Sequence, residues 1–282
     1  MTMPVLRSAA AVANPPRRPY HDDPSIVGFF RDLVEPFGST VDEQRLREGA
    51  NVSHRDLVDH LVTADGIDRP ADLVVVTHAL PDVHPFTAVA SHLNMLLGGA
   101  AQSFCVSEQG LAAPFTALRI IAAYQRAGRA RRAVLAVLEQ TTLPTPHPLV
   151  DTRDLTDSGV LLVLGDAGEP GGEDGPALSG VESFASPEDT AARLRELAAA
   201  DPAGTLLVLG PGVQDGAVDA AGARISRAGD TSYCTSVWLE LARHWRDWRR
   251  DAATVVLCDV DPLTKEGQLA VFRSPSAPGR AG

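Results

Sequence analysis

Two short segments carry the side chains best suited to acyl-group chemistry. Ser107, Glu108 and Gln109 are consecutive polar residues in one predicted loop, and His78 and His84 lie in a second loop that leads from a strand to a helix. A serine hydroxyl beside a histidine base can act as a nucleophile in acyl transfer. That chemistry needs an aligned base, and loop histidines more often serve as hydrogen-bonding residues of the loop itself. Both interpretations of His78 and His84 stay open at this point.

Three cysteines and two aspartates are further candidates. Cys105, Cys234 and Cys258 are odd in number and show no paired spacing, so they predict neither a disulfide framework nor a zinc site. Cys105 falls on a predicted strand, where we expect a small buried apolar residue. Asp259 and Asp261 lie in a predicted turn, where carboxylates more often act as solvated caps than as metal ligands. The sequence predicts no metal site and no cofactor.

Composition and charge exclude several classes of partner. The 282 residues are 44% hydrophobic and 22% charged, which is ordinary for a globular protein, and the formal net charge is −11. A nucleic-acid partner is not expected, because phosphate binding needs a basic face. Residues 1–20 contain Arg and Pro instead of the apolar core of a signal peptide, and no apolar run reaches membrane-spanning length. We therefore expect a cytoplasmic protein with no membrane partner.

The strands and helices that must position these residues form an internal repeat, in which one order of elements occurs twice. The first copy predicts strands over 5–12, 71–77, 102–106, 133–138 and 159–165, with helices over 53–63, 86–97 and 111–127; Ser53 caps the first helix and Gly128 ends the last. The second copy predicts strands over 177–184, 204–209, 223–226, 254–258 and 268–272, with helices over 187–200 and 232–245; Ser186 caps the first of these.

This repeat predicts two halves packed together. Buried strands that alternate with helices predict parallel sheets covered by helices. Two such copies side by side indicate an α/β fold in a layered α/β/α/β/α sandwich; the alternative is an ordinary doubly wound fold with one sheet. We divide the chain into a first half (1–168), a linker (169–176), a shortened second half (177–273) and a disordered tail (274–282).

Several segments, taken in order, resemble one family. ADLVVVTHALPDVHPFTAVASHLNMLLGGAAQSF, GRARRAVLAVLEQ, LTDSGVLLVLGD, GDTSYCTSVWLELARHW and ATVVLCDVDPLTKEGQLAVFR resemble successive segments of ketoacyl-ACP synthase III, of the thiolase superfamily. The last resembles the closing hairpin of that family, although the usual glycine run is replaced by Asp259-Val260-Asp261-Pro262. The resemblance implies the duplicated thiolase-like fold, over most of residues 70–168 and 204–273.

The resemblance also implies where a catalytic triad would lie. Such enzymes hold acyl groups on a cysteine at the amino end of a buried helix, where the helix dipole favours thiolate, and a histidine and an asparagine polarise the substrate. Here the cysteine position falls on Gly110, or on Leu111 when counted back from the helix end. The histidine position falls on Gly212 and the asparagine position on Asp230. All three catalytic side chains are thus replaced.

A scaffold without its triad predicts a supporting role. Gln109 lies next to the cysteine position, and glutamine replaces that cysteine in several relatives that support an active partner. The leading hypothesis is a non-catalytic ketosynthase-like subunit that pairs with an active ketosynthase, as a heterodimer or heterotetramer, in polyketide- or fatty-acid-like secondary metabolism. Acyl-carrier protein or acyl-CoA are the implied ligands. The alternative is an atypical acyltransferase, hydrolase or cyclase that acts on an acyl-thioester through Ser107, Glu108, Gln109, His78 or His84.

Overall fold

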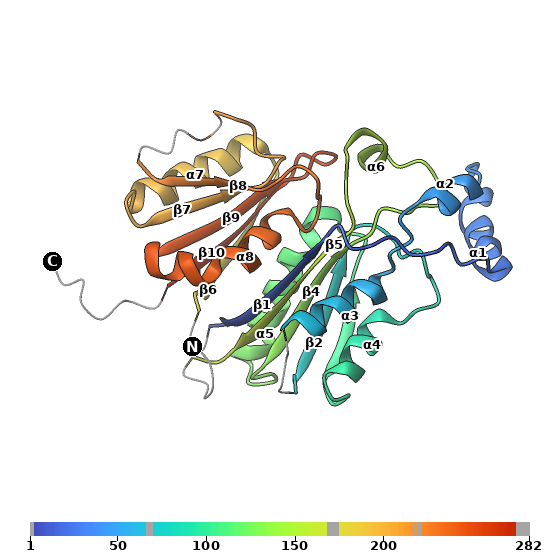
Figure 1. Ribbon diagram of the computed structural model, residues 1–282. Helices are drawn as coiled ribbons and strands as arrows, with labels where there is room; N and C mark the ends of the chain where they lie inside the picture. The colour runs from blue at the N-terminus through green and yellow to red at the C-terminus, as the bar shows by residue number, and fades with distance from the viewer. Residues whose placement is uncertain (1–2, 66–69, 168–174, 217, 219–221, 275–282) are drawn as a thin grey trace.

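The first half of the chain contains five strands and the helices between them (Figure 1). The structure is a computed structural model that describes residues 3–65, 70–167, 175–216, 218 and 222–274. The elements of the first half are β1 (Val5–Ala13), α1 (Pro24–Val34), η1 (Glu35–Phe37), α2 (Glu43–Glu48), α3 (His54–Asp65), β2 (Leu73–His78), α4 (Val89–Leu96), β3 (Gln102–Val106), η2 (Gly110–Ala112), α5 (Ala113–Arg126), β4 (Ala133–Glu139), α6 (Pro148–Thr152) and β5 (Ser158–Gly165).

The second half repeats the pattern in shorter form. Its elements are β6 (Ala177–Phe184), α7 (Pro187–Ala200), β7 (Thr205–Leu209), β8 (Arg224–Arg227), α8 (Ser236–Asp251), β9 (Thr254–Val260) and β10 (Gly267–Arg273). The predicted linker lies outside the described residues over 169–174, and the predicted tail lies outside them from residue 275. Between β7 and β8, the described residues form no counterpart of α4.

Capping residues mark several helix ends where the sequence predicts them. Ser53 Oγ accepts a hydrogen bond from Asp56 N at 3.1 Å, and Ser186 Oγ accepts one from Asp189 N at 3.1 Å, so both predicted caps are confirmed. Gly128 follows α5 with a φ of +66°, the left-handed conformation that ends helices. The expected helix over 86–97 begins only at Val89, because the preceding residues form turns.

The ten strands form one mixed sheet in the order β3-β2-β4-β5-β1-β6-β10-β9-β7-β8. Each half has the same internal order, so the two halves are mirrored about the contact between β1 and β6, where Val5 pairs with Ala177. The expectation of purely parallel sheets is wrong. β2 is parallel to β3 and β4, and β7 is parallel to β8 and β9, but every other pair is antiparallel because β1, β5, β6 and β10 run against their neighbours.

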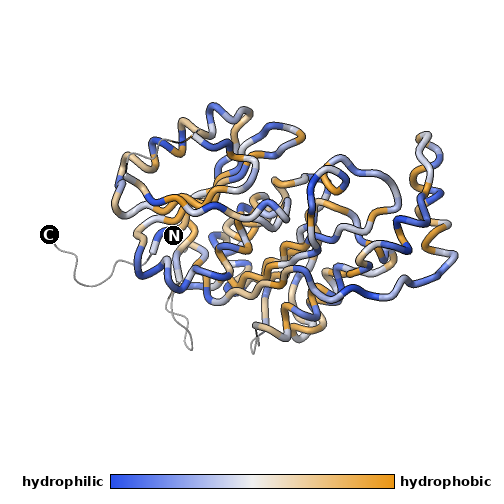
Figure 2. Tube along the Cα trace, turned by 45° about the horizontal axis from the view of Figure 1, so that its top comes forward, coloured by the Kyte–Doolittle hydropathy of each residue, from blue (hydrophilic) through white to orange (hydrophobic). Residues whose placement is uncertain are grey.

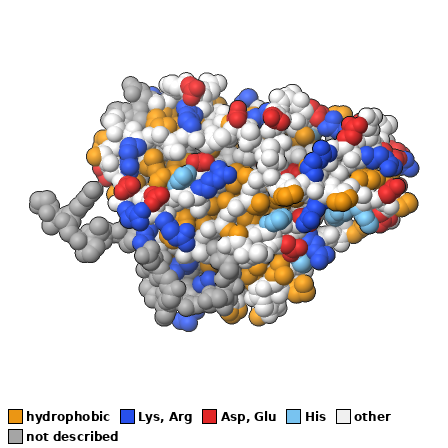
Figure 3. Space-filling model, viewed as in Figure 1, with side chains coloured by type: hydrophobic (Ala, Val, Ile, Leu, Met, Phe, Trp, Pro, Cys, Tyr) orange, Lys and Arg blue, Asp and Glu red, His pale blue; other side chains and the backbone are white. Residues whose placement is uncertain are grey.

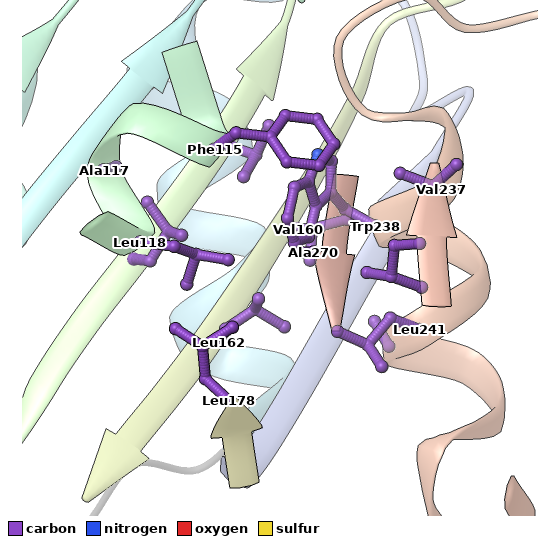
Figure 4. Close-up of a cluster of buried hydrophobic side chains, with 14 of the residues drawn as sticks. Phe115, Ala117, Leu118, Val160, Leu162, Leu178, Val237, Trp238, Leu241 and Ala270 are labelled. Carbon is purple, nitrogen blue, oxygen red and sulfur yellow. The ribbon is translucent and has the colours of Figure 1, made fainter. Parts of the chain in front are cut away.

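Two helices lie between the halves and carry the main core. α5 contacts β2, β3 and β4 of its own half and also β6 and β10, whereas α8 contacts β7 and β9 and also β1 and β5. Phe115 of α5 meets Trp238 of α8 edge to face, with ring centroids 4.8 Å apart (Figure 4). α3 and α4 cover the outer face of the first half and α7 covers that of the second, which gives the expected layered α/β/α/β/α arrangement.

Hydropathy follows this layering. The strands are mostly hydrophobic along their length, and hydrophilic residues gather on the outer helices and loops (Figure 2). On the face drawn in Figure 3, Lys and Arg side chains are interspersed with acidic and hydrophobic ones. Among the described residues, no helix has the length and apolar character needed to cross a membrane.

Candidate functional site

The position predicted for a catalytic cysteine is filled by neighbouring side chains. Gly110 begins η2, immediately before α5, and has a φ of +50°. A Cβ atom on Gly110 would lie 2.6 Å from Tyr233 Oη and 3.1 Å from Asp261 Oδ2. The Leu111 amide donates to Tyr233 Oη at 3.1 Å, and Asp261 Oδ2 lies 3.4 Å from the same amide. A helix amino end that could stabilise a thiolate or an oxyanion is therefore capped by the protein itself.

The position predicted for the histidine is filled by the backbone. Gly212 follows β7, and a Cβ atom there would lie 1.8 Å from the carbonyl oxygen of Val260. The Gly212 amide donates to Asp259 Oδ1 at 2.9 Å. No side chain fits at Gly212 without movement of the turn between β9 and β10. Residues 259–261 of this closing hairpin thus contact both Gly110 and Gly212.

Asp230, at the predicted asparagine position, lies elsewhere. It is exposed in the segment between β8 and α8, and its carboxylate is not among the groups that contact Gly110 or Gly212. The structure therefore brings two of the three predicted triad positions to the closing hairpin and leaves the third in solvent.

The expectation that Asp259 and Asp261 are solvated is wrong, because they are only 1% and 5% exposed. Asp259 Oδ2 accepts a hydrogen bond from Ser236 Oγ at 3.0 Å, and burial raises the pKa of this carboxyl to about 6. Asp261 does cap its turn, since Oδ1 accepts from Leu263 N at 2.8 Å, while Oδ2 accepts from the Tyr233 hydroxyl at 2.5 Å. The described residues contain no cluster of three or more His, Cys, Asp or Glu side chains that could hold a metal ion.

A third buried carboxylate, Glu139, was not singled out from the sequence. It ends β4, is fully buried, and accepts hydrogen bonds from Tyr233 N at 2.8 Å and Cys234 N at 2.5 Å. Burial raises the pKa of Glu139 to about 7. A signal was present, because one acidic residue ends the otherwise apolar run AVLAVLE. Glu139 fixes the segment before α8, which explains why that helix begins at Ser236 and not at residue 232.

The predicted Ser–His pair is not assembled. His78 Nδ1 lies 2.9 Å from the carbonyl oxygen of Leu80, and the His84 ring packs near the His21 ring with centroids 5.8 Å apart. Among the described residues, no hydrogen bond joins Ser107 to either histidine. His78 therefore has the loop hydrogen bond that was the plainer of its two interpretations.

The loop before Gly110, and Gly110 itself, line a pocket beside the filled cysteine position. Glu108 and Gln109 are exposed and, with Tyr233 and Asp261, line a pocket of about 470 Å³. Glu108 has a φ of +61°, a conformation that few residues other than glycine adopt. Gln109 Oε1 accepts a hydrogen bond from Thr116 Oγ1 at 2.7 Å. Two hydroxyls, of Tyr233 and Thr264, and several carboxylates line this pocket, and among the described residues no thiol or imidazole does.

Comparison with known proteins adds the fold family. No family model matches the chain, and no curated protein matches it. Among solved structures, 3-oxoacyl-(acyl carrier protein) synthase III from Pseudomonas aeruginosa is 16% identical with a TM-score of 0.65, and the match covers 97% of this chain and 99% of that one. The tetronic acid condensing enzyme AbyA1 is 14% identical with a TM-score of 0.66, covering 96% and 99%. Cerulenin-bound OleA from Xanthomonas campestris is 11% identical with a TM-score of 0.59, covering 97% and 100%.

The fold is thiolase-like. Identities this low establish the fold alone, so the function must be argued from the site. In this thiolase-like chain the amino end of α5 is capped by Tyr233 and Asp261, and the loop after β7 is closed by Val260.

The cysteines of the thiolase-like fold are not placed for thioester chemistry. Cys105 is exposed, so the expectation that it is buried is wrong: β3 is the last strand of the sheet and is covered on one edge only. Burial of part of the side chain nevertheless raises the pKa of the Cys105 thiol, which disfavours thiolate. Cys234 is buried and donates to the Leu138 carbonyl at 3.5 Å, and burial raises the pKa of its thiol well above the usual value.

A variant can test whether the Tyr233 hydroxyl stabilises the fold at the filled cysteine position. Tyr233→Phe should lower the free energy of unfolding by about 1–2 kcal/mol, because it leaves Asp261 Oδ2 and the Leu111 amide each short of a buried hydrogen bond. Tyr20→Phe is the matched control, since the Tyr20 hydroxyl is buried without a hydrogen-bond partner among the described residues. Urea unfolding of both variants measures the difference. Equal stability of the two variants would show that the hydrogen bonds of the Tyr233 hydroxyl do not stabilise the fold.

Proposed function

We propose that this chain is a non-catalytic ketosynthase-like subunit that supports an active ketoacyl synthase III-type partner in polyketide- or fatty-acid-like secondary metabolism. The observation that carries the proposal is the filling of Gly110 by Tyr233 and Asp261, and of Gly212 by Val260 and Asp259. Acyl transfer through this fold needs a nucleophile at the first position and an imidazole at the second. Here neither side chain is present, and neither would fit without movement of Tyr233, Asp261 or Val260.

The proposed ligands follow from the structural neighbours. The Pseudomonas aeruginosa protein is described as acting with acyl carrier protein, and an OleA variant has been solved with lauric acid and lauroyl-CoA bound. An acyl group of that kind would be held by the active partner. In the complex, this chain would support that partner and could contact acyl-carrier protein or acyl-CoA.

The edge strand β3 supports a pairing surface. β3 ends the strand order, and among the described residues only β2 pairs with it. An unpaired strand edge offers backbone donors and acceptors to a second chain. Residues Gln102 and Cys105 are exposed on this strand. We propose that β3 pairs with the equivalent edge of the active ketosynthase, in a heterodimer or a heterotetramer.

Co-purification tests the partnership. A tagged copy of this chain, co-expressed with an untagged ketosynthase III encoded near it, should retain that ketosynthase through size-exclusion chromatography. Cys105→Lys should reduce recovery at least about tenfold, because an edge lysine blocks strand pairing. Leu263→Lys is the matched control, since Leu263 is 52% exposed and lies between β9 and β10, outside β3. A lone monomer in the presence of all pathway proteins would contradict the proposal.

A further inference from the structure

A second cavity lies apart from the filled triad positions. It encloses about 550 Å³, and neither Gly110 nor Gly212 lines it. We call it the His54 cavity. Its polar side includes His54, His78, Asp82 and His147 together with several Ser and Thr hydroxyls, and its apolar side includes residues of α1 and of the loop after β4: Phe29, Phe30, Leu33, Val34, Leu143 and Pro144. The cavity also adjoins the proposed pairing strand, because Ser103, Phe104 and Cys105 of β3 line it.

Polar groups at the cavity wall have unmet hydrogen-bonding capacity. His54 is 1% exposed, and neither of its ring nitrogens has a hydrogen-bond partner among the described residues. Asp82 Oδ2, also without a partner there, lies 3.8 Å from His54 Nδ1, which is too far for a hydrogen bond. The other oxygen of Asp82 is held in place by the amides of His54 at 3.1 Å and His84 at 3.3 Å. Buried polar atoms are normally satisfied, so this arrangement indicates a ligand.

The available groups define what kind of ligand fits. His78 Nδ1 must donate to the Leu80 carbonyl, which leaves Nε2 of the neutral ring as an acceptor. Burial lowers the pKa of both His54 and His78, so both rings are neutral at pH 7. Asp82 adds acceptor oxygens, and no Lys or Arg lines the cavity. The neutral His54 ring offers one donor and one acceptor nitrogen, so a hydroxyl, which both donates and accepts, matches these groups. Asp82 without a neighbouring cation disfavours carboxylates and phosphates.

We propose that the His54 cavity binds a neutral, largely apolar molecule that carries a hydroxyl group. The hydroxyl donates to Asp82 Oδ2 or to the unprotonated nitrogen of His54, and the apolar body packs against Phe30 and Leu143. The cavity involves none of the residues at Gly110, Gly212 or the closing hairpin, but Ser103, Phe104 and Cys105 of the proposed pairing strand β3 line it, so the binding is tested on the isolated chain.

Three matched probes test the ligand class in the isolated chain. Isothermal titration at pH 7 should show that 2-naphthol binds about tenfold more tightly than 2-methoxynaphthalene, which keeps the ring but lacks the donor. The anion 2-naphthoate should bind more weakly still. Equal affinities for 2-naphthol and 2-methoxynaphthalene, stronger binding of 2-naphthoate, or no binding of 2-naphthol would overturn the proposal.

Variants assign the binding to this cavity. His54→Leu should abolish the preference for 2-naphthol, whereas His60→Leu, at an exposed position of the same helix, should retain it. If His54→Leu does not fold, the wild-type chain still gives an answer. Cys105 lines the cavity and is exposed, whereas Cys234 and Cys258 are buried, so maleimide should label Cys105 alone. Saturating 2-naphthol should slow that labelling at least about fivefold; an unchanged rate would place the binding elsewhere.

Discussion

Gly212→Ala should be among the most destabilising single substitutions in this chain. Its Cβ would lie 1.8 Å from the Val260 carbonyl oxygen and 2.9 Å from Asp259 Oδ1, so the closing hairpin would have to move. We expect a loss of about 3 kcal/mol or more in the free energy of unfolding, at the upper end of overpacking effects, because the obstacle is backbone. Urea unfolding followed by circular dichroism measures this loss.

Gly229→Ala provides the matched control. Gly229 precedes α8 and has no heavy atom within 4 Å of an added Cβ, so the same substitution should change stability by less than about 0.5 kcal/mol. The double variant Gly110→Cys with Gly212→His, which restores the residue types of active relatives, should fold poorly and gain no activity. A stable Gly212→Ala protein would show that the hairpin does not close this position.

The free energy of unfolding of Glu139→Gln, relative to that of the wild type, should be higher at pH 8 than at pH 5. The pKa of Glu139 is raised from 4.5 to about 7 in the folded state, so the folded state binds the proton more tightly than the unfolded state does. The contribution of this group to stability is complete below about pH 4.5 and is lost as the pH rises through about 7. The difference between variant and wild type should therefore shift by about 2 to 3 kcal/mol in favour of the variant between pH 5 and pH 8.

Comparing variant with wild type removes the titrations of groups that do not act on Glu139, whereas Asp157 and Cys234, which interact with its charge, stay in the difference. Burial lowers the pKa of His54, His78 and His147, so these groups weaken the fold on acidification below about pH 6.5, opposite to Glu139. They are unchanged in Glu139→Gln and cancel in the difference. Urea unfolding at the two pH values gives the result. A difference that does not vary with pH would mean that Glu139 is ionised at its usual pKa in the fold.

Much of the fold could be predicted because several buried strands are continuous apolar runs in the sequence. AVLAVL and TVVLC are each too apolar for a surface element, and both form central strands of the sheet. Helices α1 and α2 were not predicted, although Asp23 and Asp42 cap them through their side chains. The apolar face of α1 was present in the sequence, since Ile26, Val27 and Phe30 are buried, so this helix was missed although its pattern was there; α2 has only 6 residues and buries Leu46 alone, too little for a periodic pattern.

For the site, the sequence analysis predicted only that the three triad side chains are missing. Aligning motifs gave Gly110, Gly212 and Asp230 as triad positions, a prediction that rests on the resemblance. Motif order cannot show that the hydroxyl of Tyr233, which lies 122 positions further along the chain, accepts a hydrogen bond from the amide of Leu111. The burial of Asp259 and Asp261 was likewise missed, because a turn carboxylate is normally solvated and only the packing of two distant loops removes the solvent here.

Intact-mass spectrometry after incubation with an acyl-CoA or an acyl-carrier-protein thioester tests the central proposal most directly. If the closing hairpin fills the reaction centre, the chain should show no stoichiometric acyl adduct, and any trace on exposed Cys105 should disappear in Cys105→Ser. Peptide mapping would locate whatever adduct forms. A full-occupancy acyl group on Ser107 or Cys105 that is then transferred or hydrolysed would contradict a non-catalytic role and establish an enzyme.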